Sequence, residues 1–395
     1  MNKHLEKCDT SQKDGDWLLM PTAFHCRIDI LGQNNFETLP MPYQLFVSNA
    51  ESGTISCYKL NSSTPNTTEI LRWVTDIPAA PLVMPMIIDE KRVLLYAVIR
   101  SKPYRLLQYR IEPQGLSLTQ EWPLPASMAN IELSPDGLTA YGVSFADNLW
   151  AQTRLQDASD DTTECFSCGS HPHAIHISPD KKWLIHSELG SDRLQISSYS
   201  AEHGELRHIN VTPKSGPRHF VFSPAGDELY LLTEMSGEVI RYRIEAAGKD
   251  DISPPSLIER ERCAILPFAE MGLVPGLAPE QRQNDNQPRV WAADIHLTNN
   301  GRFLYTSERT TSRISLFEVY AGSMRYVSSF LVESCPRSFA ITPDDQWLIV
   351  TGEQASVIGL YAINSATGYL TRECEAPCGK GANWVSITLQ VERVN

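Results

Sequence analysis

The sequence lacks long hydrophobic runs. Although 42% of its 395 residues are hydrophobic, no apolar stretch approaches the roughly 18 residues that a helix needs to cross a bilayer. The first residues, MNKHLEKCDTSQKDGDW, also lack the apolar core of a secretory signal. We therefore expect no membrane association and a cytoplasmic location.

Basic residues are in the minority. The chain has 34 Lys and Arg against 47 Asp and Glu, which gives a formal net charge of −13. Proteins that bind nucleic acids or anionic membranes use clustered Lys and Arg to displace counterions. The composition therefore argues against such partners, and any anion that the protein binds should be a small molecule.

Cysteine pairs and catalytic motifs that would indicate disulfides, metals or cofactors are also missing. Nine cysteines are an odd number without the regular spacing of a disulfide framework. Two pairs, Cys165 with Cys168 and Cys374 with Cys378, have zinc-like spacing but precede separate copies of the repeat described below. The chain contains no nucleophile elbow, P-loop or glycine-rich dinucleotide turn in its proper context. The sequence predicts neither a metal nor a cofactor.

A hairpin unit recurs along the chain. Its clearest copies, residues 129–144, 173–189, 218–235 and 337–353, each combine an apolar strand, a Pro-Asp or Pro-Ala turn and a second strand. The turns of successive copies are usually 44 to 47 residues apart, with one longer step of 75 residues. This spacing is typical of four-stranded propeller blades, and counting the inner strands gives seven.

The sequence therefore predicts an all-β fold, a seven-bladed β-propeller of four-stranded antiparallel blades. The first blade begins at residues 43–49 without an inner strand of its own, so the C-terminal segment 382–389 should pair with it and close the ring. We expect one propeller domain at 41–395, an N-terminal extension of unknown role at 1–40, and an insertion at about 246–290. The insertion is a lid candidate or a solvated loop.

The repeat also predicts where polar side chains meet. In an antiparallel blade, the start of the inner strand and the end of the second strand lie on the same face, at the mouth of the central channel. The charged and imidazole side chains expected there are His171, His173, Glu188, Arg218, His219, Glu234, Asp294, Glu308, Arg309 and Arg337. Taken singly, each is better explained as a solvated surface residue, and it is their joint placement that favours a site. The pair His171 and His173 could bind a metal, but no third ligand can be assigned.

Four segments, 215–234, 289–319, 333–361 and 379–385, resemble the lactonase family of seven-bladed propellers, and the resemblance extends over about residues 43 to 390. The GPRH and WAADIH strings are the most specific parts of this resemblance. It implies a catalytic set of His173, Arg218, Glu234 and Arg309, and we expect His171, His219, Asp294 and Arg337 to contact substrate.

The resemblance further implies hydrolysis of a small anionic sugar lactone, first of all 6-phosphogluconolactone to 6-phosphogluconate in the pentose phosphate pathway. Glu234 or His173 would take a proton from water, and Arg218 and Arg309 would hold negative charge on the substrate and the developing oxyanion. Two alternatives stay open: a muconate-type lactonizing or cyclase activity on another anionic lactone, and a propeller that serves only as an interaction platform. We expect a monomer or a weak homo-oligomer.

Overall fold

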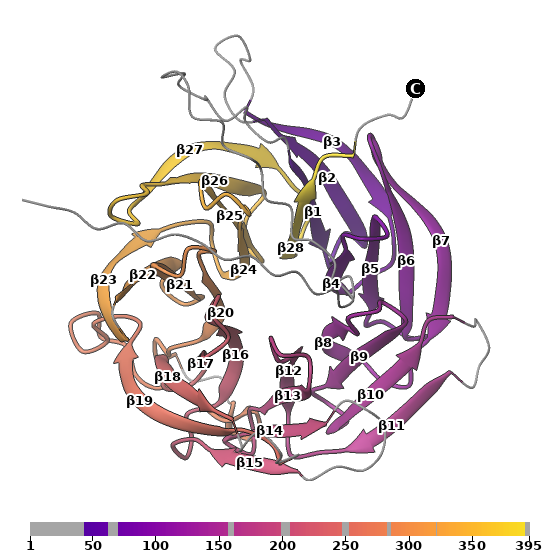
Figure 1. The fold of residues 1–395 in the computed structure, drawn as a ribbon. Coiled ribbons are helices and arrows are strands. Elements are labelled where there is room, and N and C mark those ends of the chain that lie inside the picture. The colour runs from indigo at the N-terminus through magenta and orange to yellow at the C-terminus, as the bar shows by residue number, and fades with distance from the viewer. Residues whose placement is uncertain are drawn as a thin grey trace, which may run out of the picture. The chain divides into compact units, whose positions relative to one another are not determined.

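The computed structural model describes residues 43–61, 70–156, 162–198, 206–246, 253–282, 286–320 and 322–391. The chain divides into a short unit, Met1–Leu39, and a large unit, Pro40–Asn395. The predicted extension 1–40 lies outside the described residues. Within them, seven four-stranded antiparallel sheets follow one another around a ring (Figure 1), which confirms the predicted propeller. The described part of the chain has no helix that is long and apolar enough to span a membrane.

The seven innermost strands line the centre of the ring and each pairs with the second strand of its blade. The inner strands are β28 (Ala382–Leu389), β4 (Val83–Asp89), β8 (Met128–Leu133), β12 (Pro172–Ile177), β16 (Pro217–Phe222), β20 (Ala292–Leu297) and β24 (Pro336–Ile341). The second strands are β1 (Tyr43–Asn49), β5 (Leu94–Ile99), β9 (Thr139–Ser144), β13 (Trp183–Glu188), β17 (Glu228–Thr233), β21 (Phe303–Glu308) and β25 (Trp347–Gly352).

The third and fourth strands complete each blade toward the outside of the ring. The third strands are β2 (Thr54–Leu60), β6 (Arg105–Glu112), β10 (Leu149–Arg154), β14 (Arg193–Ser198), β18 (Glu238–Glu245), β22 (Arg313–Tyr320) and β26 (Val357–Ile363). The fourth strands are β3 (Leu71–Pro78), β7 (Gly115–Pro123), β11 (Thr163–Ser167), β15 (Arg207–Asn210), β19 (Ser256–Ala264), β23 (Ser323–Leu331) and β27 (Leu370–Pro377). A short 3-10 helix, η1 (Pro279–Gln281), precedes blade six.

Ring closure follows the prediction. Strand β28, the last in sequence, pairs antiparallel with β1, the first, with Val385 opposite Val47 and Ile387 opposite Leu45 (Figure 1). Blade one therefore combines the two ends of the described propeller, and β1 is hydrogen-bonded on both sides. Such pairing removes an exposed strand edge that would otherwise be open to other chains.

The recurring turn is stabilised by a side chain at its first position. In blade three the Ser134 hydroxyl donates to Asp136 at 2.5 Å and accepts from the backbone N–H of Thr139 at 2.9 Å. Thr342 and Asp344 repeat the first contact at 2.6 Å in blade seven. Ser, Thr and Asp favour turns because their short side chains bond to nearby backbone, so the repeated sequence signal has a local structural cause.

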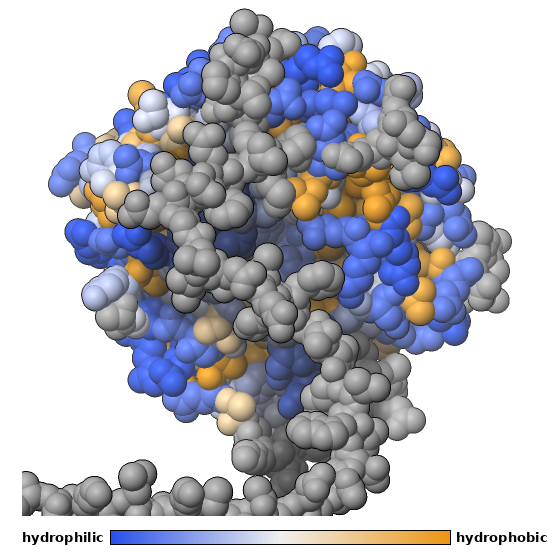
Figure 2. Space-filling model, turned by 45° about the horizontal axis from the view of Figure 1, so that its top comes forward, coloured by the Kyte–Doolittle hydropathy of each residue, from blue (hydrophilic) through white to orange (hydrophobic). Residues whose placement is uncertain are grey.

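Apolar side chains pack mainly between neighbouring blades. One cluster joins Leu232 and Val239 of blade five to Ile295 and Phe317 of blade six, and similar clusters fill other junctions. Each blade therefore depends on its neighbours for burial, as in other repeat proteins. In Figure 2 the described residues around the central hollow of the face in view are mostly hydrophilic.

Every inner strand carries an irregularity at its start that simple alternation does not predict. In blade five Pro217 pairs with Thr233 and Phe220 pairs with Leu231, so Arg218 and His219 share a single residue opposite. The inner strands of the other six blades also shift register at the equivalent end. Because a bulge re-aims the side chains that it contains, two adjacent residues can both serve the channel mouth.

The predicted insertion at 246–290 includes β19, the regular outer strand of blade five. The additional length of this connection therefore lies after β19, at residues 265–291. Here Phe268 and Leu273 pack against the cluster between blades five and six, and the N–H of Gly276 donates to the carbonyl of Met235 at 2.8 Å. These contacts hold the connection against the end of β17, next to Glu234.

Candidate active site

Glu234 is the centre of a cluster of arginines. Its Oε2 accepts from Arg218 Nε at 2.7 Å and lies 3.3 Å from Arg309 Nη2, while its Oε1 accepts from Arg282 Nη2 at 2.6 Å. The carboxylate is only 3% exposed. Its position follows from the repeat, because Glu234 comes directly after β17, where the second strand reaches the mouth.

The arginines keep Glu234 ionised. Burial alone would raise the pKa of this carboxyl, but the charges of Arg309, Arg218 and Arg282 outweigh burial and lower the pKa to about 2. Both oxygens of this ionised carboxylate already accept hydrogen bonds from guanidinium groups, which leaves neither free to approach a water. Glu234 is therefore better suited to holding the arginines in place than to removing a proton from water.

Arg218 lies deepest in the cluster. It is 1% exposed, and its Nη1 also donates to the carbonyl of Ala293 in the next blade. Burial lowers its pKa, yet an arginine paired with a buried carboxylate stays charged. Arg218 thus joins blade five to blade six and holds the Glu234 carboxylate in place.

Two histidines lie beside this cluster in the channel. The rings of His173 and His219 are 5.0 Å apart between centroids, and both residues are buried. Burial, followed by the charge of Arg218, lowers the pKa of His173 well below its usual value and lowers that of His219 to about 4. Both imidazoles are therefore neutral at physiological pH.

Asp294 sets the orientation of His219. Its Oδ1 is 2.7 Å from His219 Nδ1, and it also accepts from the backbone N–H of Ile295 at 3.0 Å. This leaves the other ring nitrogen of His219, Nε2, buried without a hydrogen-bond partner among the described residues. The Nδ1 of His173 is in the same condition. Buried nitrogens without partners are uncommon in folded proteins, and here they mark a place where a polar ligand or water would be stabilised.

The two other residues expected to contact substrate have partners of their own. His171 has a positive φ of 53°, its ring centroid is 4.4 Å from that of Phe145 in a tilted arrangement, and its Nδ1 lies 3.3 Å from Glu280 of the connection 265–291. Arg337 pairs with Glu353 at 2.9 Å. The structure therefore brings together His173, Arg218, Glu234, Arg309, His219 and Asp294. Arg337 lies near enough for its charge to affect the pKa values of His173, Arg218 and Glu234.

Arg282, Trp291 and Arg100 were missing from the sequence-based list. The Arg282 guanidinium lies 4.5 Å from the centre of the Trp291 ring, and this contact directs it toward Glu234. No repeat position could have indicated Arg282, because it belongs to the connection 265–291. Arg100 is different. Its charge is one of those that lower the pKa of His173. It directly follows the second strand of blade two, so the rule that selected Glu188 and Glu234 would also have selected it.

A pocket of about 410 Å³ opens beside the arginine cluster. Its lining combines two guanidinium groups with hydroxyl, amide and aromatic side chains: Arg282, Trp291, Arg309, Thr310, Ser312, Ser334, Cys335 and Gln354. A second cavity, of about 570 Å³, lies along the channel and is lined partly by His219, Asp294 and Trp384. His219 and Asp294 therefore face the channel interior, while Arg309 faces the mouth pocket.

The arrangement provides the groups that opening an ester ring requires. Fixed guanidinium groups can hold an anion and stabilise an oxyanion, and a neutral imidazole can accept a proton. The structure groups these side chains, and their assignment as the active site, like the catalytic role of each residue, stays a prediction.

Comparison with known proteins gives a consistent result. A family model described as lactonase, 7-bladed beta-propeller, matches residues 44–387. The chain is 29% identical over 357 residues to a 6-phosphogluconolactonase of Enterobacter sp. (strain 638), covering 88% of this chain and 99% of that protein. It is likewise 29% identical to a 6-phosphogluconolactonase of Yersinia pestis (strain Pestoides F), over 88% of this chain and 98% of the relative.

Solved structures show the same fold at lower identity. A protein from Lactobacillus plantarum superposes with a TM-score of 0.74 at 20% identity, covering 88% of this chain and 99% of that one. The periplasmic gluconolactonase of Pseudomonas aeruginosa superposes with a TM-score of 0.71 at 20% identity, covering 89% and 100%.

Proposed function

The chain belongs to the seven-bladed β-propeller lactonase family, and from this premise we propose that it hydrolyses a phosphorylated sugar lactone, 6-phosphogluconolactone, to 6-phosphogluconate. The observation that carries the proposal is the group of three arginines around Glu234 beside two neutral, partly unpartnered histidines. Curated relatives named 6-phosphogluconolactonase support the choice of substrate.

An anionic substrate fits the charge of the mouth pocket. Arg282 and Arg309 both line it, and the carboxylate that they share, Glu234, carries only one negative charge. Thr310, Ser312 and Gln354 add neutral groups to the same walls. A phosphate accepts several charge-assisted hydrogen bonds from such a set, and guanidinium groups suit it especially well because of their planar fork. In a protein of net charge −13, this local excess of positive charge favours binding of an anion.

The proton acceptor in our mechanism is His173. Both Glu234 oxygens are occupied by arginines, whereas the imidazole of His173 is neutral and has an unpartnered Nδ1. Water attacks the lactone carbonyl while His173 takes one of its protons. This forms the new C–O bond and leaves the carbonyl oxygen as an oxyanion.

The remaining groups complete the reaction. Arg309 stabilises the oxyanion, and Arg282 holds the phosphate. When the carbonyl re-forms, the bond to the ring oxygen breaks and that oxygen takes the proton from His173. The product carboxylic acid then loses its remaining proton to solvent. Arg218 contacts no substrate in this scheme, and its role is to position Glu234 and thereby the other two arginines.

A place in the pentose phosphate pathway follows from this substrate. A cytoplasmic location stays a prediction from the sequence, and one relative of the same fold is periplasmic.

A substrate panel tests the proposal. Purified protein would be given freshly generated 6-phosphogluconolactone, unphosphorylated gluconolactone and a muconate-type lactone, with acid release followed at constant pH. We expect hydrolysis well above the spontaneous rate, with the phosphorylated lactone preferred. Preference for the muconate-type lactone would favour the cyclase activity. A rate equal to background on all three would overturn the proposal in favour of a non-catalytic platform.

A further inference from the structure

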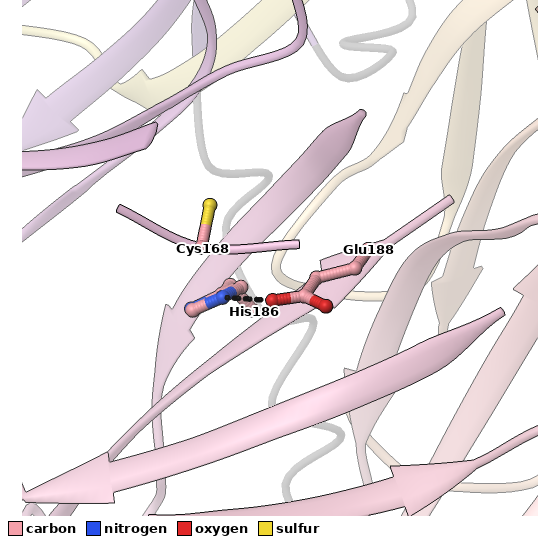
Figure 3. A group of neighbouring side chains, drawn as sticks. All are labelled: Cys168, His186 and Glu188. Carbon is pink, nitrogen blue, oxygen red and sulfur yellow. Dashed lines mark hydrogen bonds and ion pairs between the residues drawn. The ribbon is translucent and has the colours of Figure 1, made fainter. Parts of the chain in front are cut away.

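A second group of chemically reactive side chains lies away from the arginine cluster, between blades three and four. Cys168 follows β11, the outer strand of blade three, while His186 and Glu188 belong to β13, the second strand of blade four. One donor atom from each of the three residues lies within 4.8 Å of the others. Figure 3 shows the His186 and Glu188 side chains side by side in β13, with the Cys168 segment next to them.

We propose that Cys168, His186 and Glu188 form a binding site for a divalent transition-metal ion, with Zn²⁺ as the expected occupant. Thiolate sulfur, imidazole nitrogen and carboxylate oxygen are the three protein ligand types of zinc. Three protein ligands leave a fourth position for water, and the separations of the donor atoms are compatible with one shared ion.

The histidine supplies the observation that a structural contact alone does not explain. His186 is 0% exposed, and its Nδ1 has no hydrogen-bond partner among the described residues, while its Nε2 lies 3.2 Å from Glu188 Oε1. Burying an imidazole with an unpartnered nitrogen costs free energy. A ligand bound by Nδ1 would offset that cost, while Nε2 already faces Glu188.

The carboxylate is held in a fixed position. Glu188 is also 0% exposed, and its Oε1 accepts from the N–H of Gly169 at 2.8 Å while Oε2 pairs with Arg193. A Cβ at position 169 would lie 2.0 Å from Glu188 Oε2, so a larger residue there would displace the carboxylate from this position. These contacts fix the donor before any ion binds, which reduces the ordering cost of binding.

The thiol is protonated without a cation. Burial, followed by the charge of Glu188, raises the pKa of Cys168 to about 12. A bound Zn²⁺ would reverse this balance, because a thiol deprotonates when it coordinates the ion. The thiolate would then add a second negative charge beside that of Glu188, which is shared with Arg193.

The position of the site suggests its purpose. Only a few residues separate Cys168 from His173, the proposed proton acceptor, and Glu188 pairs with Pro172 in the β12–β13 ladder. A metal bound here would tie the end of blade three to the strand pair that carries His173. Its role would be structural, and the proposal does not depend on the lactonase activity.

Cobalt provides the direct test. The full-length protein would be stripped of metal with a chelator and titrated with Co²⁺, followed by competition with Zn²⁺. We expect a thiolate-to-cobalt charge-transfer band that saturates at one ion per chain and disappears when Zn²⁺ is added. Cys168→Ser should abolish the band, and His186→Gln should weaken Co²⁺ binding by about 100-fold or more.

Cys165→Ser is the matched control, because Cys165 lies in the same segment but is exposed; it should bind Co²⁺ like the unmodified protein. No charge-transfer band in the unmodified protein, or an unchanged band in Cys168→Ser, would overturn the proposal. If Cys168→Ser fails to fold, the unmodified protein still provides a test. Zn²⁺ should slow alkylation of Cys168, mapped by mass spectrometry, and equal alkylation with and without Zn²⁺ would also overturn the site.

Discussion

Arg282 and Glu234 are 48 positions apart in the chain and meet at 2.6 Å between Nη2 and Oε1. Glu234 comes from the regular repeat, whereas Arg282 comes from the connection 265–291 before blade six. Trp291 supports the guanidinium from one side. Arg282 is 38% exposed at its side chain, against 2% for Arg218, so it is the arginine of the cluster most able to exchange Glu234 for a substrate anion.

Arg282→Gln should therefore reduce activity selectively. We expect kcat/KM for 6-phosphogluconolactone to fall about 10- to 100-fold, mainly through a higher KM, because a hydrogen bond between charged groups contributes roughly 1.5–3 kcal/mol. Unphosphorylated gluconolactone should lose less than about threefold, since it has no phosphate to bind. Steady-state kinetics on both lactones would measure the difference.

Arg260→Gln is a suitable control for that experiment. Arg260 lies in β19 of the same blade, is similarly exposed and pairs with Glu245 away from the site. It should leave both rates unchanged. Equal losses on the two lactones in Arg282→Gln would contradict a phosphate-binding role for Arg282.

The buried pair of Arg218 and Glu234 should matter for stability as well as activity. Arg218→Met leaves a buried carboxylate with fewer partners, and loss of one member of such a pair typically costs about 3–5 kcal/mol. We expect the double variant Arg218→Met with Glu234→Leu to regain part of that loss but to stay at least about 100-fold below the original turnover. Urea unfolding and lactone hydrolysis would be measured on the same samples. A double variant that regained activity would exclude the pair from the site.

The fold could be predicted because the blade repeats its own local signals. Turn residues such as Ser134 and Asp136 bond within the turn that they specify, and alternation marks the strands on either side. Ring closure was also predictable, since residues 382–389 form an inner strand without a following partner and residues 43–49 lack a preceding one. Both features depend only on residues that are close in sequence and on the number of strands.

The site was only partly predictable, for two physical reasons. A two-residue alternation places Arg218 and His219 on opposite faces, and only the bulge opposite Leu232 allows both to take part. The second reason is that the spacing of the blades does not show where residues outside the repeat lie. Arg282 depends on the path of residues 265–291, and Cys168 meets His186 only because blade three packs beside blade four.

Stability should decrease as the pH is lowered through a window to which His219 contributes. Burial, and then Arg218, lowers the pKa of this histidine from 6.5 to about 4 in the folded protein. Between these values the unfolded chain binds a proton that the folded protein does not, so stability is complete above pH 6.5 and decreases as the pH falls toward 4. His219→Gln should reduce the slope of unfolding free energy against pH by up to about 1.4 kcal/mol per unit. Urea titrations between pH 7 and 5 would measure it, and an unchanged slope would mean that His219 titrates normally.

Loss of the closing strand should have a large effect. A chain that ends at Gly381 lacks β28, so β1 loses its inner partner and blade one exposes an open edge together with Val47 and its neighbours. We expect aggregation and no measurable lactonase activity, because unpaired edges associate with other chains. A chain that ends at Val391 retains β28 and should behave like the full sequence. Size-exclusion chromatography of the two would compare them, and a soluble, active protein ending at Gly381 would refute the role of ring closure.

The choice of proton acceptor can be tested by comparing two histidines of the same strand. His173 and His176 both belong to β12, but His176 pairs with Glu132 at 2.8 Å and packs edge-on against Phe220 farther along the channel. His173→Gln should lower kcat by about 10²- to 10⁴-fold, the usual contribution of a general base. His176→Gln should change kcat less than about twofold.

Because folded His173 and Glu234 both have lowered pKa values, the unmodified protein should keep a flat rate profile between pH 6 and 8. A kcat for His173→Gln close to that of His176→Gln would assign proton removal to another group, and His219, held by Asp294, would be the next one to replace.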